Sequence, residues 1–157
     1  LIIAGQAQEP TSHYKRHIRR MRLEPNIHWS GGYVPSQIVP AYFLAADLIV
    51  VPYLQGSSSA VIHMAHDFEK PVLATDVGGF SEQMDERMGD RLVRPNDPLS
   101  LSSAIIDFLT EIRSDPNDLT LKAESLKNNG ITQTDFAERH TELYLRVWTT
   151  RGKLCFG

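Results

Sequence analysis

The sequence predicts an α/β fold built on a parallel, Rossmann-like sheet with helices on both faces. Two observations predict it: short apolar runs rich in β-branched residues recur along the chain, and stretches with helical spacing separate them. Connections between neighbouring parallel strands are then right-handed. The predicted strands are residues 1–4, 27–29, 48–51, 72–74 and 92–93.

Composition limits the class of protein. A chain of 157 residues is long enough for one domain with a core and too short for two complete Rossmann-type domains. The apolar fraction of 41% and the charged fraction of 22% are ordinary for a globular protein. A net charge of −3 gives no reason to expect nucleic acid or an anionic membrane surface as a partner. No apolar run is long enough for a membrane span, and the single Cys155 fits a reducing compartment.

The first predicted strand, residues 1–4, is followed by a helix with a basic stretch. Residues 1–4 resemble the middle of a buried strand, so we expect the chain to be a piece of a longer protein, cut within a sheet. Thr11 or Ser12 can cap the following helix. Its basic stretch from Lys15 to Arg22 has two interpretations, a phosphate-binding patch or a solvated helix face, and the pattern favours the solvated face.

The second strand ends in a glycine turn. This βα turn needs a positive φ at Gly31 or Gly32. Ser36 is placed to cap a helix that runs to Ala46, and Pro40 is tolerable in its first turn. Further on, Asp97 followed by proline predicts the start of another helix.

The central stretch, residues 48–82, carries the predicted site. A buried strand leads into Gly56 and three serines, which open a helix, and a second strand leads into a turn with Gly78 and Gly79. Free N–H groups at a helix start form an anion site. Two such turns at the carboxyl edge of a parallel sheet mark the ligand site of an open α/β fold. The serines can act as ligands, as helix caps, or as both.

This stretch resembles the donor-sugar half of the retaining GT-B glycosyltransferases, of the group 1 type. The resemblance lies in the pattern "PY…GxSSAVI…A…F.KPVLATDVGGFSE" and in the preceding "NIHWSGGYVPSQIVPAYFLAADLIVVPY". It covers roughly residues 1–113 and a closing helix near the C-terminus. It implies a nucleotide-sugar-binding domain over 1–113 whose first βα unit is missing. Residues 114–157 would be C-terminal helices, the last of which packs towards an absent N-terminal domain.

The resemblance also suggests site residues. Its usual pair of glutamates falls on Gly56 and Met64, and neither has a carboxylate. Gln55, one position earlier, could hydrogen-bond a sugar. The turn after the second strand would meet the nucleotide base, although an ordinary βα turn explains it equally well. The candidate donor-binding residues are Gly32, Tyr33, Val34, Gln55, Gly56, Ser57, Ser58, Ser59, Met64, Gly78, Gly79 and Glu82.

The implied function is transfer of a sugar from a nucleoside-diphosphate sugar to an acceptor hydroxyl in glycan or polysaccharide biosynthesis. The donor is a substrate, and no cofactor is expected. The acceptor, a glycan or a lipid-linked glycan, would bind through the missing domain, in the cytoplasm or at the inner membrane face. Two alternatives stay open: a non-catalytic binding or scaffolding module, and, more distantly, a nucleotide-sugar epimerase. His63 and His66 have a spacing that a metal permits, but no third ligand is visible, so no metal site is predicted.

Overall fold

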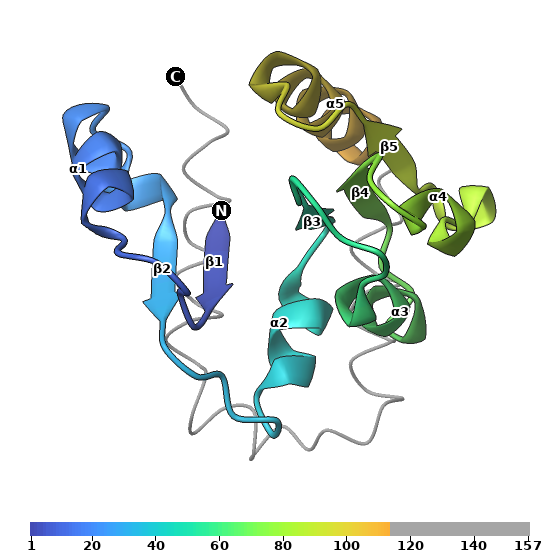
Figure 1. Ribbon diagram of the computed structural model, residues 1–157, viewed down its shortest axis with the longest axis horizontal. Helices are drawn as coiled ribbons and strands as arrows, with labels where there is room; N and C mark the ends of the chain where they lie inside the picture. Colours follow the sequence, from blue (N-terminus) through green and yellow to red (C-terminus); the bar gives the residue numbers. More distant parts are fainter. Residues whose placement is uncertain (114–157) are drawn as a thin grey trace. The chain divides into compact units, whose positions relative to one another are not determined.

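The computed structural model describes residues 1–113, which fall into two compact units, residues 1–39 and residues 40–113 (Figure 1). Helices alternate with short parallel strands in both units, which confirms the predicted α/β class. Every predicted strand is present, with ends that differ from the prediction by one or two residues. The helices predicted over 114–157 lie outside the described residues. Within residues 1–113, no helix has the length and apolar character needed to cross a membrane.

The first unit pairs two strands and packs one helix against them. Strand β1 lies parallel to β2, with Ile3 opposite Trp29. Tyr14, on helix α1, lies beside Trp29 with 6.3 Å between ring centroids. Gly32 has φ of 132°, as the predicted turn requires. The elements are β1 (Ile2–Gly5), α1 (Ser12–Arg20), a 3₁₀ turn (Glu24–Asn26) and β2 (His28–Gly31).

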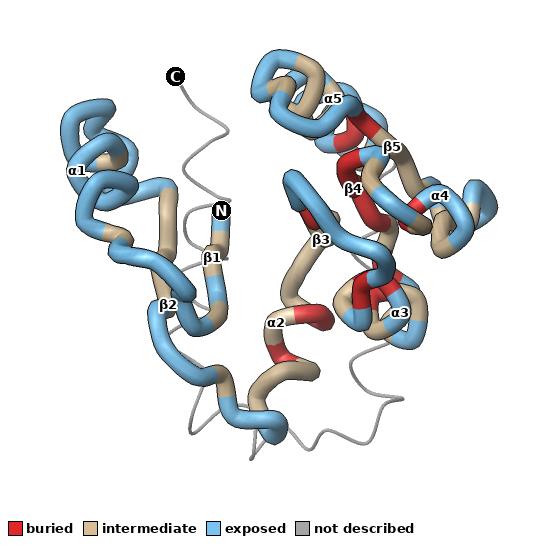
Figure 2. Tube along the Cα trace, in the orientation of Figure 1, coloured by how far each residue is buried: buried red, intermediate tan, exposed pale blue. Residues whose placement is uncertain are grey.

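The second unit contains a three-stranded parallel sheet in the order β3-β4-β5. All four residues of β4 are buried, and this strand is the middle one of the sheet (Figure 2). The sequence predicted a strand covered on both faces at 48–51, but β3 is half-buried except at Val51. The elements are α2 (Val39–Ala45), β3 (Ile49–Val51), α3 (Ala60–Asp67), β4 (Val72–Thr75), α4 (Phe80–Gln83), a 3₁₀ turn (Glu86–Met88), β5 (Arg91–Val93) and α5 (Pro98–Arg113).

Two predicted helix starts have different outcomes. Asp97 caps α5 as predicted, because its Oδ1 accepts a hydrogen bond from the Ser100 amide at 3.0 Å, and Pro98 is the first helical residue. Helix α2 begins at Val39, so Ser36 is not its cap. Pro40 lies in the first turn of α2, where its missing N–H costs no helical hydrogen bond.

The residues after Glu82 predict a helix that ends near Gly89, but α4 ends at Gln83. Asp85 has an extended backbone, and its carboxylate accepts hydrogen bonds from the amide and guanidinium of Arg87, which lowers the pKa of Asp85. The Asp85 amide donates to the Asp90 carboxylate at 2.9 Å rather than into a continuing helix. A side-chain acceptor therefore breaks the helix and turns the chain towards β5.

Asp90 joins three segments of the second unit. Its side chain is fully buried, with Oδ1 accepting from the Val72 amide at 2.8 Å and Oδ2 lying 2.7 Å from His66 Nε2. Because Oδ2 also accepts from the Asp85 amide, one carboxylate joins the start of β4, the end of α3 and the loop after α4. Sequence reasoning did not single out Asp90.

Candidate functional site

The first part of the site is the turn from β3 to α3. Residues 52–58 are exposed, and Ser59 is buried. Thr75, at the end of β4, fastens this turn, since its hydroxyl donates to the Tyr53 carbonyl at 2.5 Å. The carboxyl ends of β3 and β4 are thereby joined, and the exposed backbone between Pro52 and Ser58 is held at this edge of the sheet.

The second part is the turn from β4 to α4, which lies directly on the first. The Gly79 amide donates to the Ser57 carbonyl at 3.1 Å. Gly78 has φ of 51°, and a Cβ added there would lie 1.9 Å from the Gly56 carbonyl oxygen. The two turns thus touch through their backbones, and only glycine permits that approach. The predicted adjacency of the two glycine turns is present in the structure.

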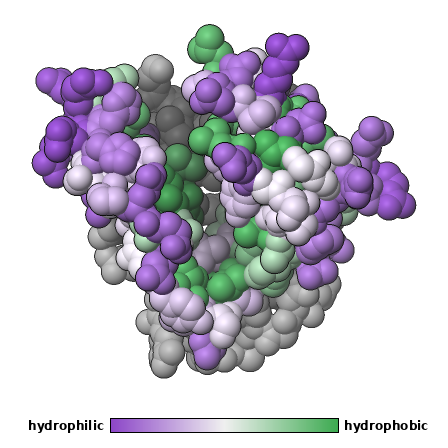
Figure 3. Space-filling model, in the orientation of Figure 1, coloured by the Kyte–Doolittle hydropathy of each residue, from purple (hydrophilic) through white to green (hydrophobic). Residues whose placement is uncertain are grey.

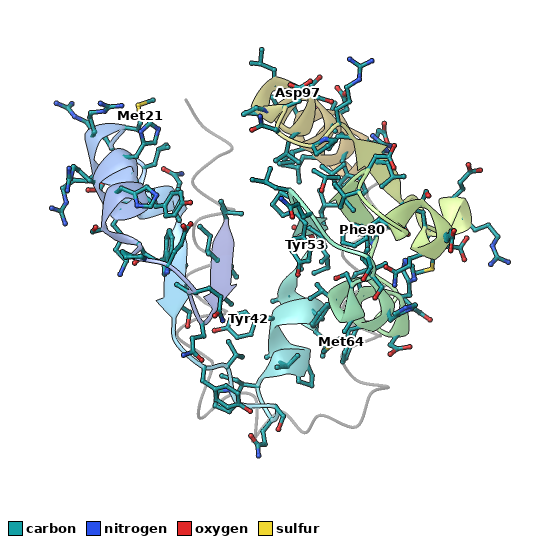
Figure 4. All side chains as sticks on the ribbon, viewed as in Figure 1. Met21, Tyr42, Tyr53, Met64, Phe80 and Asp97 are labelled. Atoms are coloured by element: carbon teal, nitrogen blue, oxygen red, sulfur yellow. The ribbon has the colours of Figure 1, made fainter. Side chains whose placement is uncertain are left out.

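Aromatic rings pack beneath this contact. The Phe80 ring is fully buried, and a Cβ added at Gly56 would lie 3.2 Å from it. Tyr53 lies against Phe80 with ring centroids 5.6 Å apart, as Figure 4 shows. Gly56 therefore lies against a buried ring, and a side chain at this position, such as the glutamate that the resemblance places there, would require the Phe80 ring to move by a few tenths of an ångström.

Gln83 holds the start of α3, and the sequence analysis missed it. Its Oε1 accepts a hydrogen bond from the Ser59 amide at 2.9 Å, and its Nε2 lies 3.4 Å from the Ser59 carbonyl oxygen. The same Nε2 lies 2.7 Å from His63 Nε2. No local sequence signal points to Gln83, because its partners lie 20 and 24 residues away.

These contacts correct the expected helix start. Helix α3 begins at Ala60, with Ser59 as its cap residue, so residues 56–58 lie in the turn rather than in the helix. The Ser59 amide is taken by Gln83. The Ser59 hydroxyl makes no capping bond and is buried without a hydrogen-bond partner among the described residues. Capping therefore does not explain Ser59, and the N–H groups left for an anion are those of its neighbours.

The other predicted residues are distributed as follows. Gln55, Ser57 and Ser58 are exposed on the first turn. Glu82 is exposed on α4, and its Oε2 would lie 3.9 Å from a Cβ added at Gly79. Met64 is half-buried on α3, apart from the Tyr53–Phe80 pair in Figure 4. Gly32, Tyr33 and Val34 belong to the first unit.

The two histidines of α3 have different neighbours. His63 contacts Gln83, and His66 contacts the buried Asp90. Within residues 1–113, no three His, Cys, Asp or Glu side chains lie close enough together to hold a metal ion. Both histidines make polar side-chain contacts within the second unit.

A hollow in the first unit is a separate feature. It measures about 580 Å³ and lies between α1 and the β1–β2 sheet. Its lining is mainly apolar and aromatic, and it contains no predicted donor-binding residue. It lies under α1, and Gly5 and Gly31, where the two strands end, are not among its lining residues. Its lining residues are Ile3, His13, Tyr14, His17, Ile18, Ile27 and Trp29.

Comparisons with solved structures show the class of fold. HepE of Anabaena matches in two crystal structures, one with UDP-glucose (TM-score 0.57, 20% identity, 91% of this chain and 36% of that one) and one with UDP (TM-score 0.60, 20% identity, 97% and 40%). A glycosyltransferase of Rickettsia africae ESF-5 matches with a TM-score of 0.59 and 21% identity over 94% of this chain and 39% of that one. The fold is therefore that of the GT-B glycosyltransferases.

Comparison of sequences shows the family. The family model for glycosyl transferases group 1 matches residues 1–111, so the chain belongs to this family. The glycosyltransferase TuaC of Bacillus subtilis (strain 168), named for teichuronic acid biosynthesis, is 39% identical over 82 residues, which is 52% of this chain and 21% of TuaC. The chain thus spans about a fifth of TuaC and less than half of the matching solved chains.

Proposed function

We propose that this chain is the donor-binding part of a glycosyltransferase that moves a sugar from a nucleoside-diphosphate sugar to an acceptor hydroxyl. The observation that carries the proposal is the backbone contact of the two glycine turns, with the Gly79 amide on the Ser57 carbonyl. This contact gathers exposed backbone at the carboxyl ends of β3 and β4, where an open α/β sheet binds its ligand. Family membership and the nucleotides bound to HepE support a nucleotide-sugar donor.

The diphosphate lies against the first turn in this proposal. The amides of Ser57 and Ser58 and the first amides of α3, at Ala60 and Val61, are its donors, aided by the positive end of the α3 dipole. The Ser59 amide is excluded because Gln83 accepts its hydrogen bond. These groups stabilise the charge that develops on the leaving diphosphate.

Three further contacts complete the proposed donor site. Gln55 hydrogen-bonds the sugar, and Glu82 approaches the same ligand from the start of α4. Met64 contributes packing alone, since a thioether is a weak acceptor.

The acceptor in this proposal is a glycan or a lipid-linked glycan. The name of TuaC, a teichuronic acid biosynthesis glycosyltransferase, supports a role in polysaccharide assembly. The acceptor would bind to a part of the protein that these 157 residues do not include. We therefore expect the isolated chain to bind a donor without transferring its sugar.

Calorimetric titration tests the proposal. The chain is titrated with UDP, GDP and ADP, and with uridine, guanosine and adenosine as matched controls without phosphate. At least one diphosphate should bind more than tenfold tighter than its own nucleoside, since each charge-assisted hydrogen bond to the diphosphate contributes on the order of 1.5–3 kcal/mol. Equal affinities within every pair would overturn the proposed site. Sugar transfer by the isolated chain would contradict the placement of the acceptor in another part of the protein.

A further inference from the structure

Helix α1 has a cationic outer face. Its residues Tyr14, His17 and Ile18 face the β1–β2 sheet, where they line the hollow. Helical geometry places Arg16, Arg19 and Arg20 on the opposite side, whereas the Nζ atom of Lys15 lies 5.8 Å from the centroid of the Trp29 ring. The basic residues are all exposed, and Figure 3 shows the hydrophilic surface that they form over α1. We call this surface, made of Lys15, Arg16, Arg19, Arg20 and Arg22, the α1 basic face.

The charge of the α1 basic face contrasts with that of the whole chain. Residues 1–39 contain five Lys or Arg and two Asp or Glu, whereas the whole chain contains 16 and 19. The first unit is thus positive while the remainder is negative. The net charge of −3 gave no reason to expect an anionic surface as a partner. It is the sum of a positive first unit and a negative remainder, so it hides the positive charge of the first unit.

Folding alone does not account for this arrangement. The pairs Lys15–Arg19 and Arg16–Arg20 are like charges four residues apart, which destabilise a helix. The dipole favours cations in the last turn, but Lys15 and Arg16 precede that turn, and the first turn has no acidic residue. Among the described residues, the acidic contact of this face is Arg19 with Glu24, at 4.0 Å with both side chains mostly exposed.

The residue that ends α1 is also a cation at a position where local backbone preference favours another residue type. The Arg22 amide donates to the Arg19 carbonyl, and the Leu23 amide donates to the Ile18 carbonyl, which closes the helix in a Schellman arrangement. This arrangement needs a left-handed residue, usually glycine, at the position that Arg22 occupies with φ of 56°. Arg22 therefore has a strained backbone conformation, and its side chain adds another cation at the edge of the α1 basic face.

We infer that the α1 basic face docks the protein on an anionic lipid bilayer. Two apolar side chains at its end favour a bilayer over a nucleic acid or an anionic glycan: Met21 is 55% exposed and Leu23 is 40% exposed. Apolar side chains beside a cationic row gain free energy in the headgroup region, and a hydrated polyanion offers no such gain. This inference is independent of the proposed sugar transfer, because it depends on the first unit alone.

Vesicle co-sedimentation of the 157-residue chain tests the inference. The chain should bind vesicles of phosphatidylcholine mixed with phosphatidylglycerol, should not bind pure phosphatidylcholine, and should dissociate as salt rises. Arg16→Gln with Arg20→Gln should weaken binding at least tenfold, because each basic residue at an anionic surface contributes about fivefold. The matched control is Arg87→Gln with Arg94→Gln, which removes the same charge from exposed positions of the second unit. The affinity of this control for anionic vesicles should stay within twofold of that of wild type.

A second variant separates the bilayer from other polyanions. Met21→Ser should weaken vesicle binding severalfold and leave binding to heparin or duplex DNA unchanged. Burial of an apolar side chain lowers the free energy of binding to a bilayer, but not of binding to a hydrated polyanion. Equal affinity for anionic vesicles, heparin and duplex DNA, unaffected by Met21→Ser, would overturn the inference. So would absence of binding to anionic vesicles, or an equal loss in the control pair.

Discussion

The side-chain amide of Gln83 contacts both backbone polar groups of Ser59. Oε1 of Gln83 accepts a hydrogen bond from the Ser59 N–H at 2.9 Å, and Nε2 of Gln83 lies 3.4 Å from the Ser59 carbonyl oxygen. Ser59, the residue that precedes α3, is thereby held by a side chain of α4, and this contact links the two turns of the candidate site. Gln83 is a positioning residue in this arrangement, since it acts through Ser59 rather than on the ligand.

Gln83→Ala should release the Ser59 amide. A lost hydrogen bond of this kind lowers the free energy of unfolding by about 1 kcal/mol and should speed hydrogen exchange at Ser59 severalfold. Gln83→Glu keeps an acceptor for the amide, so exchange should stay slow, but its charge should weaken diphosphate binding. Exposed Gln37→Ala, in the first unit, is the control. Unchanged exchange at Ser59 in Gln83→Ala would show that the contact does not hold the helix start.

Ser58→Asp should abolish diphosphate binding, because its carboxylate would lie among the amides proposed to hold the phosphates. Ser58→Ala should bind within about twofold of wild type, since the backbone N–H remains. Calorimetric titration with the nucleoside diphosphate that binds wild type measures both variants. If Ser58→Asp binds as tightly as wild type, the phosphates sit elsewhere, and the Gly78–Gly79 turn becomes the next candidate.

Ser59→Ala and Asp97→Ala compare two helix-cap residues. Asp97 makes a capping bond to the Ser100 amide, so its loss should cost about 1 kcal/mol of unfolding free energy. The buried Ser59 hydroxyl has no partner among the described residues, so its removal should leave stability unchanged or raise it by up to about 1 kcal/mol. Urea denaturation measures both. A destabilisation by Ser59→Ala as large as that by Asp97→Ala would mean that the hydroxyl has a partner in solution.

Gly78→Ala should separate the two turns. The new Cβ would lie 1.9 Å from the Gly56 carbonyl oxygen, a distance that backbone movement must relieve, so we expect a loss of about 2 kcal/mol or more and weaker diphosphate binding. Gly5→Ala is the control, because φ there is 137° and nothing lies within 4 Å of the added atom. It carries backbone strain without a clash and should leave diphosphate binding intact. Equal binding by Gly78→Ala and wild type would remove this contact from the site.

Asp90→Asn should destabilise the second unit by about 1–3 kcal/mol. The buried carboxylate accepts from the Val72 and Asp85 amides, and an asparagine must present an N–H₂ group to one of these donors or to His66. Exposed Asp107→Asn on α5 is the matched control and should change stability by less than about 0.5 kcal/mol. Similar urea midpoints for the two variants would contradict the role of Asp90 as a buried junction.

Local patterns in the sequence were enough for the order of strands and helices, since apolar runs and cap residues act over a few neighbouring positions. The start of α5 at Asp97 and Pro98 is an example, because capping bond and proline lie within one turn of each other. The family resemblance and the glycine turns also came from the sequence. The extent of α4 did not, because the Asp85 amide turns to Asp90, a partner that helical spacing does not show.

The sequence by itself determined that Gly56, Gly78 and Gly79 stand in turns after parallel strands. Only the tertiary structure decided that these turns touch, that Gln83 takes the Ser59 amide, and that the Ser59 hydroxyl lacks a partner among the described residues. The physical reason is the distance along the sequence between the residues that interact. A turn is set by the φ that its own residues permit, whereas the contact of Gln83 with Ser59 joins residues 24 positions apart. That contact exists because β3 and β4 lie side by side and bring both turns to one edge of the sheet.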